Sequence, residues 1–187
     1  DLFSNNHLFT GLLGDIYSDT GDYEKAIINY KKAISKAPED DETLYSYANF
    51  LIGTGKRKEG IEYVNRVLEV NPYHAISYYS LSTIIDVKKE IEIKEKILNL
   101  EVENFKKQED HYTVLFSKAH IFHKLKEYDR SANFLKKAND IKLLTRPSNI
   151  NELVGLSETI KNKTSLRKSF DEPKFQFLRD IFIVGLP

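Results

Sequence analysis

Residues 13–38 read LGDIYSDTGDYEKAIINYKKAISKAP, and this stretch decides the fold. Its small, aromatic and aliphatic residues recur every three or four positions, which is the spacing of one face of an α-helix. Gly21 separates two such segments, and Pro38 ends the second because proline cannot continue a helix. The stretch therefore predicts two antiparallel helices joined by a tight turn.

The same pattern returns after thirty-four residues, with Pro72 standing in the place of Pro38. The positions that hold Gly14, Tyr17, Gly21, Ala26, Tyr30 and Ala33 in the first copy are occupied in the second by Ala48, Leu51, Gly55, Gly60, Val64 and Val67. This period and this order of residue types resemble the tetratricopeptide repeat, whose unit is a pair of helices.

Two further copies are less regular. The third begins near Ala75 and lacks the glycine turn, and its apolar residues Ile93, Ile97 and Leu100 come one position early, which predicts a shortened turn. The fourth begins near Tyr112, three residues late, so we expect residues 104–110 to form a longer connection. The helices of each pair can cross closely only at a small residue, and these positions hold Gly14, Ala48, Ser82 and Ala119.

The expected fold is all-α, a right-handed α-solenoid of about four tetratricopeptide helix pairs followed by a capping helix and an extended tail. The repeats are expected at about residues 7–40, 41–74, 75–108 and 112–145, and the capping helix at about 149–163. A solenoid needs such a cap because its last repeat otherwise exposes an apolar face. Together these segments form a predicted tetratricopeptide repeat domain over residues 1–163.

Residues 164–187 have a different character. A polar stretch typical of a linker is followed by Ile181–Leu186, an apolar run typical of a buried strand. In this context the run resembles the first strand of the sulfotransferase domain in bacterial tetratricopeptide-repeat sulfotransferases. That resemblance implies that the chain is the severed N-terminal part of such an enzyme. The alternatives are a tail that closes the solenoid and self-association through Ile181–Leu186.

Composition excludes several functions. Lys and Arg number 28, as do Asp and Glu, so the chain has no net charge that would attract nucleic acid or an anionic membrane. No apolar run approaches the ~20 residues of a membrane span. The chain has no cysteine, which excludes disulfides, thiolate catalysis and zinc–thiolate sites. We expect a cytoplasmic protein that is not an enzyme as given and that requires no cofactor.

The resemblance implies binding on the concave surface lined by the first helix of each repeat. We therefore expect an interaction module that holds a peptide or a partner protein in this groove, or alternatively the targeting part of a sulfotransferase. The predicted groove residues are Asp15, Asp19, Glu42, Tyr45, Asn49, Tyr79, Thr83, Asp86, Phe116, His120, His123 and Lys124. The groove is predicted to be acidic at one end and rich in His and Lys at the other.

Other ligand classes fit poorly. The repeats that bind acidic chaperone tails use a clamp of Lys, Arg and Asn side chains, and only Asn49 resembles a member of that clamp. His120 and His123 share a helix face as metal-binding pairs do, but no third ligand accompanies them. Asp15 with Asp19, and Glu90 with Glu92, have the spacing of acid/base pairs, which on repeat helices is usually that of solvated faces.

Overall fold

The computed structural model describes residues 6–147 and 154–155. The chain separates into two compact units, residues 1–146 and 147–187, and the first contains the repeats. Its helices are α1 (His7–Asp19), α2 (Tyr23–Lys36), α3 (Asp41–Gly53), α4 (Arg57–Val70), α5 (Ala75–Ile84), α6 (Ile91–Leu98), the 3₁₀ helix η1 (Val102–Asn104), α7 (Gln108–Lys124) and α8 (Tyr128–Thr145).

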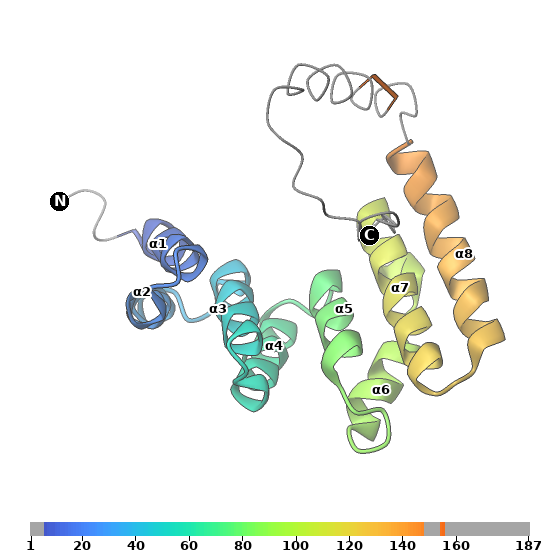
Figure 1. Ribbon diagram of the computed structural model, residues 1–187, viewed down its shortest axis with the longest axis horizontal. Coiled ribbons are helices and arrows are strands. Elements are labelled where there is room, and N and C mark those ends of the chain that lie inside the picture. The colour runs from blue at the N-terminus through green and yellow to red at the C-terminus, as the bar shows by residue number, and fades with distance from the viewer. Residues whose placement is uncertain (1–5, 148–153, 156–187) are drawn as a thin grey trace, which may run out of the picture. The chain divides into compact units, whose positions relative to one another are not determined.

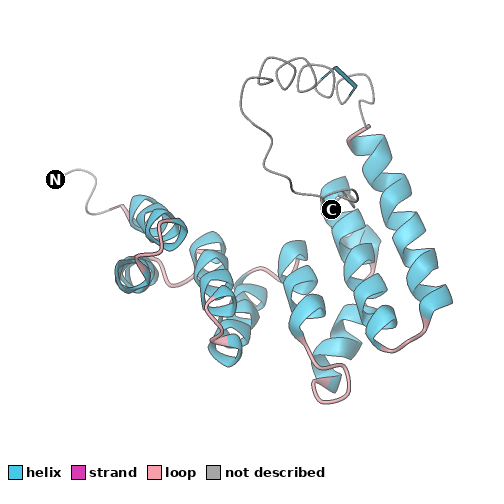
Figure 2. Cartoon of the chain, viewed as in Figure 1, coloured by secondary structure: helices cyan, strands magenta, loops and turns pink. Residues whose placement is uncertain are grey.

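The helices of the first unit form a layered array of antiparallel pairs. Helices α1, α3, α5 and α7 form one row, with α2, α4 and α6 beneath it, whereas α8 lies beside α7 (Figure 1). The described residues consist of helices and loops, without a strand (Figure 2). The predicted all-α repeat fold is therefore confirmed.

The turn within each pair has the same backbone geometry in three of the four copies. Gly21 and Gly55 have φ angles of 80° and 85°, and Lys126 occupies the equivalent position in the fourth copy with a φ of 66°. Glycine adopts this left-handed region without steric cost, whereas a residue with a Cβ does not. Lys126 thus stands where the first two copies have glycine.

The core lies between the helices of each pair and between neighbouring pairs. A Cβ placed on Gly14 would lie 2.7 Å from Cδ1 of Tyr30, so only glycine fits this crossing as it stands. Ala48, Ser82 and Ala119 are buried at the equivalent positions. Tyr30, Tyr47 and Phe50 belong to an aromatic cluster between the first two repeats. Small residues thus set the helix crossings, and large ones fill the space beside them.

The third repeat departs from the prediction. Its turn, residues 85–90, is longer than the three-residue turns of the other copies, so the predicted shortening is wrong. The helices are shorter instead: α5 has 10 residues and α6 has 8. Moreover, α5 packs mainly on α7 and only slightly on α6. Two of the apolar residues that come early, Ile93 and Ile97, lie on α6, which packs differently from the second helices of the other repeats.

Two cations from neighbouring helices accompany the early end of α5. Arg57 Nε donates to the carbonyl oxygen of Ile84 at 2.9 Å, and its guanidinium also pairs with Glu90. Lys124 Nζ donates to the carbonyl oxygens of Thr83 and Ile85 at 2.7 and 2.9 Å. These bonds satisfy carbonyl groups that the end of a helix leaves without partners.

The connection before the fourth repeat is longer than the other connections between repeats, as expected, but it lies at residues 99–107 and not at 104–110. It contains η1 and is held by Lys118 Nζ, which donates to the Leu100 carbonyl oxygen at 2.5 Å. His111 Nε2 lies 2.6 Å from the Phe105 carbonyl oxygen. Residues 108–110 already belong to α7.

The predictions for the C-terminal segment fall largely outside the described residues. Val154 and Gly155 are helical and lie within the predicted capping helix. The rest of that helix, the predicted linker and Ile181–Leu186 belong to residues that the structure does not describe.

Candidate interaction surface

Most of the predicted groove residues line one of three cavities. The first, which we call the acidic cavity, has a volume of about 400 Å³ and lies between the first and second repeats. It contains the predicted residues Asp15, Asp19 and Asn49. Its full lining is Asp15, Ser18, Asp19, Tyr23, Tyr30, Ser46, Asn49, Phe50, Gly53 and Thr54.

A hydrogen bond orients one carboxylate of the acidic cavity. The Tyr30 hydroxyl donates to Oδ1 of Asp15 at 2.7 Å. Burial and then this bond raise the pKa of Tyr30 above its usual value, so the phenol stays protonated and continues to donate. Asp15 is thus held in place at the wall, while Asp19 is exposed beside it.

The second cavity, which we call the histidine cavity, has a volume of about 390 Å³ and lies against α5, α7 and α8. It contains four predicted residues: Thr83, His120, His123 and Lys124. Ala119, Ser131 and Leu135 complete the lining and add apolar surface. A side chain with an apolar part could therefore be accommodated here.

The histidine cavity is less cationic than the sequence predicts. Burial lowers the pKa of His120, and the nearby Lys124 and His123 lower it further, so its ring is neutral at pH 7. Burial and the charge of Arg57 also lower the pKa of Lys124, although its ammonium group donates to the two carbonyl oxygens at the end of α5.

The third cavity, which we call the edge cavity, was not predicted apart from Glu42. It has a volume of about 630 Å³ and lies where the connections between repeats meet the beginnings of α3, α5 and α7. Its lining is Asp41, Glu42, Asn71, Tyr73, His74, Ala75, Ile76, Asn104, Lys106, Lys107 and Asp110. The available signal was the period itself, because it places every connection between repeats at the same edge.

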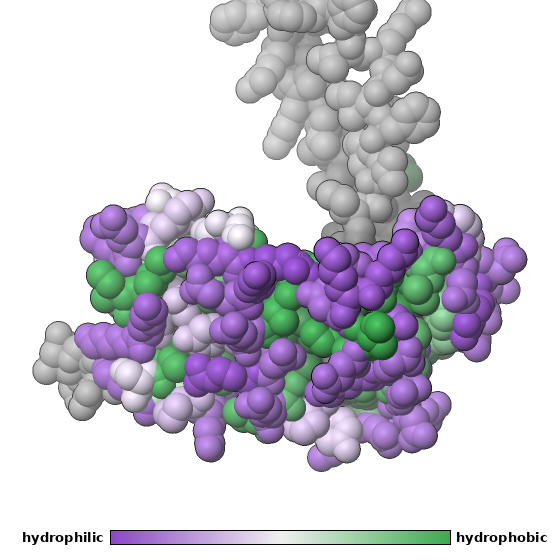
Figure 3. All heavy atoms as spheres, turned by 90° about the horizontal axis from the view of Figure 1, so that it is seen from below, coloured by the Kyte–Doolittle hydropathy of each residue, from purple (hydrophilic) through white to green (hydrophobic). Residues whose placement is uncertain are grey.

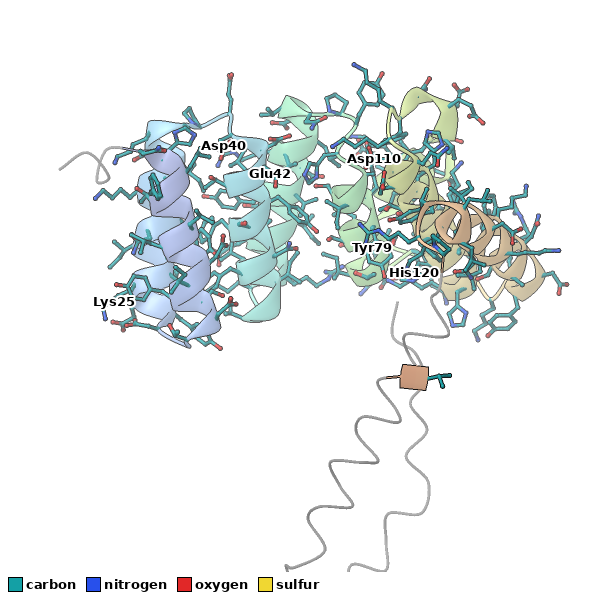
Figure 4. The ribbon with its side chains drawn as sticks, turned by 90° about the horizontal axis from the view of Figure 1, so that it is seen from above. Lys25, Asp40, Glu42, Tyr79, Asp110 and His120 are labelled. Carbon is teal, nitrogen blue, oxygen red and sulfur yellow. The ribbon has the colours of Figure 1, made fainter. Side chains whose placement is uncertain are left out.

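The predicted aromatic residues Tyr45 and Tyr79 connect neighbouring repeats. The Tyr45 hydroxyl lies 2.8 Å from Oγ of Ser80, and its ring lies 4.9 Å from that of His74. Tyr79 contacts His120 with 5.1 Å between ring centroids, and Figure 4 shows the two side chains close together. Both tyrosines are partly exposed, so each serves packing and surface at once.

One predicted residue, Asp86, is placed differently from the expectation. Asp86 lies in the turn after α5 and not on a first helix. In this turn its carboxylate accepts a hydrogen bond from the Lys88 amide at 3.0 Å. Phe116 lies on α7, the first helix of the fourth repeat, and is half-buried, with the Lys142 ammonium group 5.7 Å from its ring centroid.

In the described part of the chain, the geometry does not support a metal site, and it gives one of the candidate acid/base carboxylates a structural role. Among the described residues, no three His, Asp or Glu side chains gather as a metal site requires. Glu90 pairs with Arg57 at 2.9 Å, which gives this carboxylate a structural role. No helix in the described part of the chain is long and apolar enough to cross a membrane.

Comparison with known proteins agrees with this geometry. Family models described as tetratricopeptide repeat match residues 17–83 and 112–143. The gap between them contains the long turn, α6 and the long connection. Neither match reaches residues 164–187, and the sulfotransferase resemblance has no support. No curated protein matches the chain.

Among solved structures, one named "MamA RS-1 ArsTM double mutant" matches with a TM-score of 0.55 and 18% sequence identity, covering 77% of this chain and 79% of that chain. At this identity the likeness concerns the fold, which in both cases is a helical solenoid. Together with the two family matches, it shows that this chain is an all-α protein built from tetratricopeptide repeats.

Proposed function

We propose that the repeats form a protein-interaction module that holds an extended peptide along the first helices, α1, α3, α5 and α7. The observation that carries this proposal is the succession of partly exposed polar and aromatic side chains along these helices. Asn49 and Thr83 are exposed, and Tyr79 is half-buried. An amide side chain such as Asn49 can both donate to and accept from a peptide backbone.

The two cavities on this surface differ in chemistry and would give the peptide a direction. Asp15 and Asp19 favour a basic side chain in the acidic cavity. The histidine cavity, with its neutral His120 and with Leu135 and Ala119 in its lining, favours an apolar or aromatic side chain. The proposed ligand thus carries Lys or Arg at one end and an apolar anchor at the other.

The spacing of the helices sets the length of such a ligand. Packed helix axes lie ~8–10 Å apart, so the path from α1 to α7 covers roughly 30 Å. An extended chain advances ~3.3 Å per residue, so about nine residues connect the two cavities. Tyr79 lies along this path, and a rigid ring is an efficient anchor because little entropy is lost when it is covered.

A displayed library of random peptides tests the proposal. The full chain is expected to select peptides with a basic residue separated by several positions from an apolar one. Asn49→Ala and Tyr79→Ala are each expected to weaken binding of a selected peptide about fivefold or more, which corresponds to ~1 kcal/mol. Lys31→Ala, an exposed change on α2, is the matched control and should leave the affinity unchanged.

Circular dichroism of both variants separates loss of binding from loss of folding. Equal affinities for Asn49→Ala, Tyr79→Ala and the wild-type chain, with helicity retained, would place the ligand on another surface and contradict the proposal.

A further inference from the structure

The two ends of the repeat array expose the two halves of an interface that already exists within the chain. The first and second repeats superimpose in sequence by a shift of 34 residues, and the first and fourth by 105. The first helices of these repeats end at Asp19, Gly53 and Lys124, and these positions are related by the same two shifts. Each residue of the contact between the first two repeats therefore has a counterpart at the open ends.

The internal contact is made by the first helix of one repeat on the second helix of the repeat before it. Tyr47 and Phe50 of α3 are only 2% and 6% exposed, because they pack on α2. Their rings lie 5.3 and 5.6 Å from that of Tyr30, and the Phe50 ring lies 5.7 Å from that of Tyr23.

On α1, the first described helix, the corresponding half of this interface is exposed. Leu13 and Ile16 occupy the positions of Tyr47 and Phe50, yet they are 44% and 55% exposed. Leu12, one position before Leu13, is also exposed. Figure 3 shows apolar surface at the α1–α2 end of the molecule. Helix α1 thus carries the apolar face with which α3 binds its predecessor.

At the other end, α8 presents the receiving half. Tyr128 and Leu135 occupy the positions of Tyr23 and Tyr30, and they are 58% and 37% exposed. The histidine cavity is the counterpart of the acidic cavity, because four residues of its lining, His120, His123, Lys124 and Leu135, correspond to Asp15, Ser18, Asp19 and Tyr30. In the acidic cavity α3 supplies the remaining wall, with Ser46, Asn49 and Gly53.

The charges at the two ends are complementary. The counterparts of Ser46, Asn49 and Gly53 on α1 are Leu12, Asp15 and Asp19. If α1 occupied the open side of the histidine cavity as α3 occupies that of the acidic cavity, its two carboxylates would lie on the side of the Lys124 ammonium group. Opposite charges in apposition favour one partner and one register.

We propose that a second copy of this chain docks there, with α1 of one molecule packed on α7 and α8 of the next. This contact is heterologous, so it builds chains of molecules unless its rotation closes a ring. One helix on one helix pair buries little area, and interfaces at the small end of the range are weak. Assembly is therefore concentration-dependent. The junction does not use Asn49 or Tyr79, but it shares Asp15, Asp19 and the histidine cavity with the proposed peptide site, so a second copy and the peptide would compete there. Asn49→Ala and Tyr79→Ala should therefore weaken peptide binding without changing association.

A mixing experiment with two full-length variants tests the junction. Ile16→Lys damages the α1 end and Leu135→Lys damages the α8 end. Each variant alone is expected to be monomeric by sedimentation at concentrations where the wild-type chain associates. An equimolar mixture is expected to form discrete dimers, because the intact α8 end of the first fits the intact α1 end of the second. The control variant is Ile28→Lys, which changes an exposed apolar residue on α2, outside the junction, and it should associate like the wild type.

A charge exchange provides a second test. Asp19→Lys and His123→Asp are each expected to weaken association. The double variant is expected to restore it, because the introduced lysine of one copy then faces the introduced aspartate of the next. A wild-type chain that stays monomeric throughout the concentration series overturns the proposal. So does association that survives both lysine variants, as contact through Ile181–Leu186 would, and so does a mixture that stays monomeric.

Discussion

The imidazole ring of His120 lies 5.1 Å from the phenol ring of Tyr79, in a contact that joins α7 to α5. The surroundings of this imidazole favour its neutral form. Burial lowers the pKa of His120 first, and the facing Lys124 and His123 lower it further. Burial also lowers the pKa of His74, although Asp41, Glu42 and Asp110 oppose that change.

Stability is therefore expected to fall in mild acid. The unfolded chain binds protons at His120 and His74 near pH ~6.5, whereas the folded chain binds them at lower pH. The free energy of unfolding should be at its plateau above pH ~6.5 and decrease as the pH falls below it. His120→Gln should reduce this dependence when urea denaturation is followed from pH 8 to about 5. An unchanged dependence in His120→Gln would show that this imidazole has an ordinary pKa.

The crossing of α1 and α2 predicts opposite effects of one substitution at two glycines. In Gly14→Ala the new methyl group would lie 2.7 Å from the ring of Tyr30, so we expect overpacking to lower the free energy of unfolding by about 1–3 kcal/mol. Gly53→Ala adds a methyl group with no atom within 4 Å, and it should stabilise the chain by ~0.5–1 kcal/mol. Thermal melts of the two variants check the difference, and equal shifts would contradict the repeat packing.

The turn between α7 and α8 holds Lys126 in a left-handed conformation with a φ of 66°. This conformation costs a residue with a Cβ ~1–2 kcal/mol, and glycine avoids it at an entropic cost of ~0.5–1 kcal/mol. Lys126→Gly is therefore expected to raise stability by up to about 1 kcal/mol, measured by urea denaturation. A lower stability of this variant would show that the lysine side chain contributes to the turn.

Local patterns were sufficient to predict the regular repeats. Pro38 and Pro72 stop helices, Gly21 and Gly55 make turns, and small residues mark the crossings. Each of these effects acts within one repeat, so the sequence displays them directly. The third repeat was predicted less well because its form depends on distant groups. Arg57 and Lys124 donate hydrogen bonds to the end of α5 from other repeats. The sequence near residues 83–85 contains no pattern that indicates these contacts.

The candidate site was predicted as a set of positions but not as a set of environments. The period placed Asp15, Asn49, Tyr79 and His120 on the first helices. It gave no information on the hydrogen bond from Tyr30 to Asp15 or on the burial of His120, because both depend on how the helices pack. The edge cavity was missed because its residues come from two connections and from the beginnings of three helices, none of which has a recognisable pattern alone.

The most direct measurement of the central proposal is backbone NMR of the full chain titrated with a peptide selected from the random library. We predict that the amide resonances shifted most belong to α1, α3, α5 and α7 around Asp19, Asn49, Tyr79 and His120, and that α2 and α4 change little. Shifts concentrated on α2 and α4, or around Asn71, Lys106 and Lys107 of the edge cavity, would contradict binding along the first helices.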